Sequence, residues 1–188
     1  MSATLALKGA MPRERAAVSA LFLANGYVVG NWAPKVPSFK ADLGIDEAVL
    51  GLMILAMGVG SLVTMPLIGA AIAREGSRRI SIAAGLLLSP VMLFLTLMPG
   101  PWSAAAMALL LGGLIGGMDV AMNANAVAVE RRMGRAIMSS CHAWWSVGAL
   151  IGAATGGVLI GRFGPLGHAL AVFVVTLGIV VAATGAVM

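Results

Sequence analysis

The chain contains long stretches without a charged side chain, and these constrain its fold more than any other feature. Residues 16–34, 48–73, 80–118 and 136–161 contain no Asp, Glu, Lys or Arg. The hydrocarbon core of a bilayer is about 30 Å thick, and about 20 apolar residues of helix cross it. A membrane β-strand would be about half that length and would alternate apolar with polar side chains. The stretches therefore predict membrane-spanning α-helices.

Six such helices fit the chain. Pro99-Gly100-Pro101 must divide the longest stretch, because proline removes a backbone donor and disrupts a helix. The expected spans are 16–34, 48–73, 80–98, 102–129, 136–161 and 167–187. Only 10% of the residues are charged and 60% are hydrophobic, whereas a soluble domain carries about 25% charged residues. We expect an all-α polytopic membrane bundle.

The basic residues predict how this bundle is oriented. Nine of the 12 lie in the amino-terminal tail and in the loops after the second and fourth spans, at Lys8, Arg13, Arg15, Arg74, Arg78, Arg79, Arg131, Arg132 and Arg135. Short loops rich in Lys and Arg stay in the cytoplasm, so we expect a cytoplasmic amino terminus. The net charge of +5 is thereby assigned to a membrane surface and not to nucleic acid. A signal peptide is the alternative for the first span, but residues 31–35 lack a small-x-small cleavage site.

An internal repeat is the next feature. Residues 59–76 resemble residues 147–164, which lie 88 positions later, and the two segments share Gly-x4-Arg-x-Gly. Spans two and five would cross the membrane in opposite directions, and inverted three-helix units are a building scheme of secondary transporters. We expect a tail at 1–12 and repeats at 13–100 and 101–188. The alternative is a pair of unrelated Gly/Ala-rich helices that each end in a basic residue.

Several motifs resemble a known family. Gly69-x-x-x-Ala73-Arg74-x-Gly76-Ser77-Arg78-Arg79 resembles the loop signature of the major facilitator superfamily. Four further segments are similar to its YbjJ-type bacterial branch, which is related to the fucose permeases: Asn31-Trp32-Ala33-Pro34, Asp119-Val-Ala-Met-Asn123, Val129-Glu130-Arg131 and Met138-Ser-Ser-x-His142. The resemblance runs from about residue 13 to the end. It implies a secondary active transporter of the inner membrane that works by alternating access on a small solute.

The resemblance assigns a cytoplasmic gating loop to Gly69, Arg74, Gly76, Arg78 and Arg79, and it has two departures. The aspartate that the family usually carries in this loop is replaced by Ala73, so a charge contact between halves is missing or replaced. Family members have twelve spans, and only six are expected here. We expect a truncated amino-terminal half whose second six-helix bundle is absent; the alternative is a partner that supplies that half.

Asp119 is the strongest candidate for chemistry, because it is the only acidic residue inside an expected span. A carboxylate at the bilayer centre costs about 2.5–3.5 kcal/mol on insertion scales, so it should face a cavity or a partner. A proton or cation site is one interpretation. A hydrogen-bonded carboxyl that fastens two helices is the other.

Four more polar residues accompany Asp119 as candidates for a solute or proton pathway. Asn123 lies one helical turn beyond it, Asn31 lies 88 residues before it, Asn25 precedes Asn31 in the first span, and His142 could join a proton relay. If the repeat has no gap, Asn31 and Asp119 are equivalent and flank a midplane cavity. The alternative for each asparagine and for His142 is an interhelical hydrogen bond.

Other chemistries have little support. Two histidines and a single cysteine, Cys141, do not make a metal site, and no cofactor is expected. Cys141 and His142 diverge by about 100° as helix neighbours, so they are not a nucleophile and its base. A six-span hydrolase that uses Ser61 or Ser146 with His142 remains an alternative, as does a non-transporting assembly partner. Lipid and a small solute are the expected binding partners.

Overall fold

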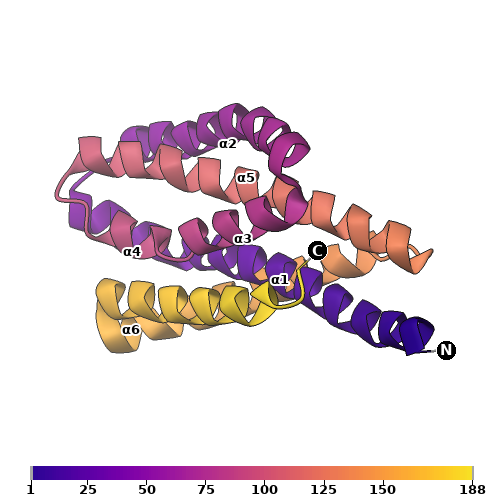
Figure 1. Ribbon diagram of the computed structural model, residues 1–188. Coiled ribbons are helices and arrows are strands. Elements are labelled where there is room, and N and C mark those ends of the chain that lie inside the picture. Colours follow the sequence, from indigo (N-terminus) through magenta and orange to yellow (C-terminus); the bar gives the residue numbers. More distant parts are fainter. Residues whose placement is uncertain (1, 188) are drawn as a thin grey trace.

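The structure is a computed structural model that describes the backbone of residues 2–187 and the side chains of residues 13–187. This part of the chain is helical and contains no β-strand. The helices are α1 (Ser2–Leu43), α2 (Glu47–Glu75), α3 (Ser77–Leu88), α4 (Val91–Thr96), α5 (Pro101–Met133) and α6 (Met138–Thr184). They lie roughly along one axis and form an elongated bundle (Figure 1). The prediction of an all-α bundle is confirmed.

Local sequence explains where the helices begin and end. The carboxylate of Asp46 accepts a 2.8 Å hydrogen bond from the backbone N–H of Val49, which caps the start of α2. Gly76 takes φ 83°, a conformation that favours glycine, at the turn between α2 and α3. The predicted break at residues 99–101 is confirmed, because α4 ends at Thr96 and α5 begins at Pro101.

Four segments are long and apolar enough to cross a membrane: Glu47–Glu75, Ser77–Thr96, Pro101–Met133 and Met138–Thr184. Helix α1 is not among them, since its uncharged run contains Asn25 and Asn31. Helix α6 has 47 residues, which would extend on the order of 70 Å if straight. It bends at Gly164, which is non-helical with φ 70° and ψ 177° and precedes Pro165. Its limbs, residues 138–163 and 165–184, fold back on each other (Figure 1).

The expected third span lies within the candidate span Ser77–Thr96 for most of its length, but it is not one continuous helix. Residues 80–98 were expected to form one helix, but α3 ends at Leu88 and α4 begins at Val91. Pro90 lies at the junction and has no N–H to continue the helix. The carbonyl of Gly85 accepts the last hydrogen bonds of α3, from the backbone N–H of Ser89 at 3.1 Å and from its hydroxyl at 2.8 Å. The first helix also differs, because α1 runs from Ser2, inside the expected tail, to Leu43.

Two helix pairs are held together by close backbone contacts. Helix α1 packs along the first limb of α6, and a Cβ on any of three glycines would collide with the facing helix: Gly26 with Trp145, Gly30 with Ala149 and Gly148 with Leu23. Helices α2 and α5 approach as closely: a Cβ on Gly112 or Gly60 would collide with the backbone of Met57 or Leu109, and a Cβ on Gly116 with the Ser61 hydroxyl. Small residues let membrane helices approach closely, so these glycines set both helix pairs.

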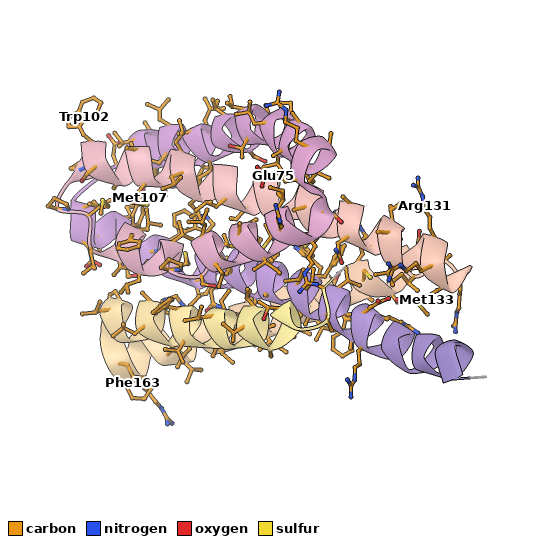
Figure 2. The ribbon with its side chains drawn as sticks, in the orientation of Figure 1. Glu75, Trp102, Met107, Arg131, Met133 and Phe163 are labelled. Atoms are coloured by element: carbon orange, nitrogen blue, oxygen red, sulfur yellow. The ribbon has the colours of Figure 1, made fainter. Side chains whose placement is uncertain are left out.

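The two ends of the bundle differ in chemistry. Trp102 and Phe163 lie at one end, whereas Arg131 and Met133 lie at the other (Figure 2). Large apolar side chains are exposed along the sides between these ends, including Leu62 at 73% and Leu150 at 70%. An apolar outer surface of this kind fits lipid contact or contact with further protein.

Candidate solute pathway

Asp119 and Asn123 meet on one face of α5, as their spacing predicts. The side-chain amide of Asn123 donates to the backbone carbonyl of Asp119 at 2.8 Å and to its carboxylate at 3.3 Å. Both side chains are partly exposed. The Asp119 carboxylate therefore accepts a hydrogen bond from the Asn123 amide and is still accessible from outside the helix bundle.

His142 approaches the same face from a different helix. It lies in the first turns of α6, is exposed, and is close enough to Asp119 for an electrostatic interaction. Its ring packs edge-on against Phe22 of α1, with centroids 5.1 Å apart. We call Asp119, Asn123 and His142 the acidic cluster. The structure thus brings three of the five candidates to the same part of the bundle, with a hydrogen bond between Asn123 and Asp119 and an electrostatic interaction between His142 and Asp119.

Asn25 has a different environment. It is 1% exposed and uses both ends of its amide. Its Nδ2 donates to the carbonyl of Ile115 on α5 at 3.2 Å, and its Oδ1 accepts from the indole N–H of Trp145 on α6 at 2.9 Å. The side chain therefore joins three helices, which is the alternative role considered for it.

Asn31 is also enclosed. It is fully buried, its Nδ2 donates to the carbonyl of Tyr27 at 2.8 Å, and its Oδ1 lies 2.9 Å from Nε2 of His168. Gly152 and Gly156 on the first limb of α6 leave room for the amide. Asn31 therefore bonds to His168 and connects α1 to both limbs of α6, where the sequence had suggested a partnership with Asp119.

Sequence reasoning missed His168. It follows the Gly164-Pro165 bend by three residues and is fully buried, and its Nδ1 has no hydrogen-bond partner among the described residues. Lys35 is 1% exposed and interacts electrostatically with His168. We call Asn31, Lys35 and His168 the buried polar cluster. A histidine within an apolar stretch, directly after a helix break, is the signal that could have pointed to it.

The expected gating loop lies at the end of the bundle that carries Arg131. Arg74 is exposed in the last turn of α2, where a cation is favourable, and Gly76 makes the turn into α3. Arg78 donates to the carbonyl of Thr184, at the end of α6, at 3.4 Å. Arg79 is exposed, and the space around a Cβ on Gly69 is open. One of the three arginines thus fastens the loop to α6.

The loop between α5 and α6 is held by a carboxylate that sequence reasoning did not assign. Glu130 accepts hydrogen bonds from the backbone N–H groups of Ile137 at 2.6 Å and Met138 at 2.9 Å, which caps the start of α6. Arg132 forms an ion pair with Glu14 of α1 at 3.1 Å. Both contacts fix the end of α5 against its neighbours.

Among the described residues, no group of three or more His, Cys, Asp or Glu side chains could hold a metal ion.

Comparison with known proteins identifies the family of this arrangement. The profile of the Major Facilitator Superfamily matches residues 11–188. The chain belongs to the major facilitator superfamily. It is therefore a membrane-embedded protein of a transporter family, and this membership argues against an enzyme such as the hydrolase considered from the sequence.

Three relatives are similar to the chain over most of its length. It is 43% identical over 137 residues, 73% of the chain, to an uncharacterised MFS-type transporter of Yersinia pestis. It is 41% identical over 142 residues, 74% of the chain, to the uncharacterised transporter y4wD of Sinorhizobium fredii. It is 36% identical over 143 residues, 76% of the chain, to the membrane protein MosC of Rhizobium meliloti. These matches cover 35%, 37% and 35% of the relatives, so the chain spans only about a third of their length.

Proposed function

We propose that the complete protein is a secondary active carrier that moves a small solute across a bacterial inner membrane by alternating access, and that it belongs to the YbjJ-type, fucose-permease-related branch. Membership of a transporter family supports transport. The motifs at residues 31–34, 119–123 and 138–142 support the branch. The acidic cluster is the single observation that carries the mechanism.

The acidic cluster has the features of a coupling site. An ionisable group inside a membrane span is costly and faces a cavity or a partner. Asp119 keeps its side chain partly exposed, receives the amide of Asn123, and has a titratable imidazole from a second helix nearby. Proton exchange between the Asp119 carboxylate and water on this open face would couple solute movement to a proton gradient.

Substitution of Asp119 tests this proposal in the complete protein. Proteoliposomes that contain a pH-sensitive dye would be challenged with a panel of sugars, amino acids and organic amines, and proton entry would be recorded. We expect at least one solute to drive proton entry, and Asp119→Asn to reduce the rate by about tenfold to a hundredfold, as for other positioned proton-transfer groups.

Asp42→Asn is the matched control, because Asp42 is an exposed carboxylate near the end of α1 and lies outside the acidic cluster. It should leave the rate unchanged. If Asp119→Asn shows solute-driven proton entry at the wild-type rate, the coupling role of Asp119 is refuted. The 188-residue chain alone should give no solute-driven proton entry, because it lacks a second wall for the cavity.

We also propose that residues 13–100 and 101–188 are two three-helix units with inverted topology, after a tail at 1–12. The glycine contacts support it. Gly26 and Gly30 of α1 correspond to Gly112 and Gly116 of α5, which lie 86 residues later. Trp145 and Ala149 of α6, which face Gly26 and Gly30, lie 88 residues after Met57 and Ser61 of α2, which face Gly112 and Gly116. Each contact between α1 and α6 thus has a counterpart between α5 and α2.

The two spacings change which residues are equivalent. With the spacing of 86 residues between α1 and α5, Asn31 corresponds to Gly117, and not to Asp119 as the spacing of 88 had suggested. This fits the different environments of Asn31 and Asp119. The inverted arrangement requires six membrane crossings, of which α1 would be the first and the two limbs of α6 the last two.

We infer a cytoplasmic amino terminus from the basic loops. Cysteine labelling tests the orientation, because the native Cys141 is buried. Arg74→Cys and Arg131→Cys should react with a membrane-impermeant maleimide from the same, cytoplasmic side. Leu43→Cys, at the end of α1, serves as the control and should react from the opposite side. Labelling of Arg74→Cys and Arg131→Cys from different sides would refute the six-crossing arrangement.

A second six-helix bundle would complete the carrier, whether it is part of a longer chain or a separate subunit. The relatives are nearly three times as long as the matched segment, and large apolar side chains of α2 and of the first limb of α6 are exposed. In the proposed carrier, this bundle faces the acidic cluster and provides the opposite wall of the pathway, and the gating loop moves against it.

A further inference from the structure

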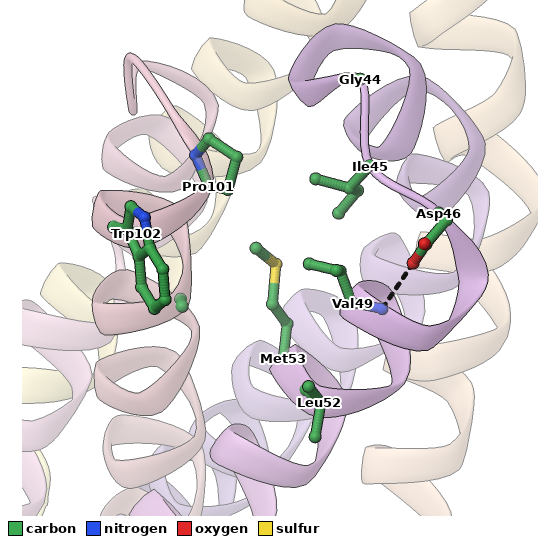
Figure 3. Close-up of a pocket in the computed structure, with 9 residues that line it drawn as sticks. Gly44, Ile45, Asp46, Val49, Leu52, Met53, Pro101 and Trp102 are labelled. Atoms are coloured by element: carbon green, nitrogen blue, oxygen red, sulfur yellow. Dashed lines mark hydrogen bonds between the residues drawn. The ribbon is translucent and has the colours of Figure 1, made fainter.

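An apolar pocket of about 390 Å³ lies at the end of the bundle remote from Arg131. Figure 3 shows Pro101 and Trp102 of α5 on one side and Ile45, Val49 and Met53 on the other. Met53 is 2% exposed and closes the pocket on the inside. Asp46 is the one charged residue in the lining.

The surroundings of the pocket are those of a lipid-facing surface. Trp102, in the first turn of α5, lines the pocket and is 90% exposed. Tryptophan is enriched where a membrane protein meets the lipid head groups, so the pocket opens at that depth. Its volume lies at the lower end of the about 300–1,000 Å³ typical of small-molecule sites. It can take part of one acyl chain and is too small for a whole two-chain lipid.

Charge at the pocket favours one class of head group. The nearby chain, residues 40–47, has one lysine against three carboxylates. Lys40 is paired with Glu47, and Lys35 interacts with Asp42. The Asp46 carboxylate accepts only the hydrogen bond from the backbone N–H of Val49 and has no cationic partner among residues 13–187. An amine in the head group would supply that partner, whereas an anionic head group would be repelled.

We propose that this pocket binds one acyl chain of an amine-bearing phospholipid, with the ammonium group of the lipid against the Asp46 carboxylate. The site is separate from the acidic cluster and needs only membrane embedding, so it holds whether or not the protein is proton-coupled. Phosphatidylethanolamine is the test ligand, and phosphatidylglycerol is the anionic comparison.

Quenching of Trp102 fluorescence by brominated lipids tests the proposal. The complete protein would be placed in nanodiscs containing a small fraction of either lipid with brominated acyl chains. The Trp102 signal is the difference between the wild type and Trp102→Phe. We expect this signal to be quenched about two- to fivefold more by brominated phosphatidylethanolamine than by brominated phosphatidylglycerol, as for one partly exposed ion pair.

Trp144 provides the matched control, because it is 47% exposed on α6 and does not line the pocket. Its signal, from the difference with Trp144→Phe, should show no head-group preference. Asp46→Asn keeps the helix cap and should abolish the preference at Trp102 while acyl-chain quenching persists. Ile45→Phe and Ala105→Phe each fill the pocket and should lower that quenching; circular dichroism would verify the fold.

Three results would overturn the proposal. Equal quenching of Trp102 and Trp144 by both lipids would show that no acyl chain is held in the pocket. Equal quenching of Trp102 by the two head groups in the wild type would remove the role of Asp46. Protection of Trp102 that increases with the number of chains per nanodisc would show that a second copy of the chain occupies the pocket instead.

Discussion

The acidic cluster and the buried polar cluster contain similar residues in opposite environments. Each has an asparagine and a histidine from two different helices, together with one charged side chain. Asn31, Lys35 and His168 are almost fully buried, whereas Asp119 and Asn123 are partly exposed and His142 is exposed. Both limbs of α6 contact Asn31, through Gly152 and Gly156 of the first limb and His168 of the second.

The comparison shows that residue type alone does not determine whether a polar side chain in a membrane bundle has a structural or a functional role. An enclosed amide that is hydrogen-bonded to another helix contributes to the fold. A carboxylate that keeps an open side can exchange protons. Covering helices therefore decide which role each polar residue has, and this difference leads to predictions for stability and for reactivity.

Loss of Asn31 should have the largest effect. Asn31→Ala leaves Nε2 of His168 buried without a partner, and an unsatisfied buried group costs about 1–3 kcal/mol. Asn123→Ala is the matched control, because Asn123 is partly exposed, and it should change the free energy of unfolding by less than about 0.5 kcal/mol. Reversible unfolding in detergent micelles measures both. Equal losses for the two variants would remove the distinction between the clusters.

A double-mutant cycle sharpens the same test. If Asn31→Ala destabilises the protein mainly by removing the Asn31–His168 hydrogen bond, the effects of Asn31→Ala and His168→Ala on the free energy of unfolding should not add. The difference should be about 0.5–3 kcal/mol, as for residues in direct contact. Additive effects would mean that the two side chains contribute through separate packing. Asn123→Ala combined with His168→Ala should be additive, since these residues belong to different clusters.

The sequence allowed much of the fold to be predicted. Uncharged stretches and the Pro99-Gly100-Pro101 break placed α2, α5 and both limbs of α6, because the cost of charge in lipid dominates helix placement. The sequence did not reveal that Pro90 separates α3 from α4. Proline in a membrane helix can be accommodated by its neighbours, and the outcome depends on packing that a single sequence does not specify.

The candidate site was predicted less completely. The spacing of Asp119 and Asn123 placed them on one face, because helical periodicity is local. The partners of Asn25 and Asn31 on other helices lie 90 to 137 residues away in the chain, at Ile115, Trp145 and His168. A fixed offset of 88 residues could not identify them, since the contacts between α1 and α6 and between α5 and α2 show a two-residue difference in register.

The two histidines should also differ in their rates of chemical modification, which is the smallest of the expected effects. Diethylpyrocarbonate acylates imidazole rings that it can reach. Exposed His142 should therefore react about tenfold faster than buried His168, a difference equivalent to about 1.4 kcal/mol. Peptide mass spectrometry of the protein in detergent would give both rates. Asn31→Ala should accelerate the reaction of His168 and leave that of His142 unchanged. Similar rates in the wild type would mean that the second limb of α6 opens readily, and Asn31 and His168 would then also be accessible to water.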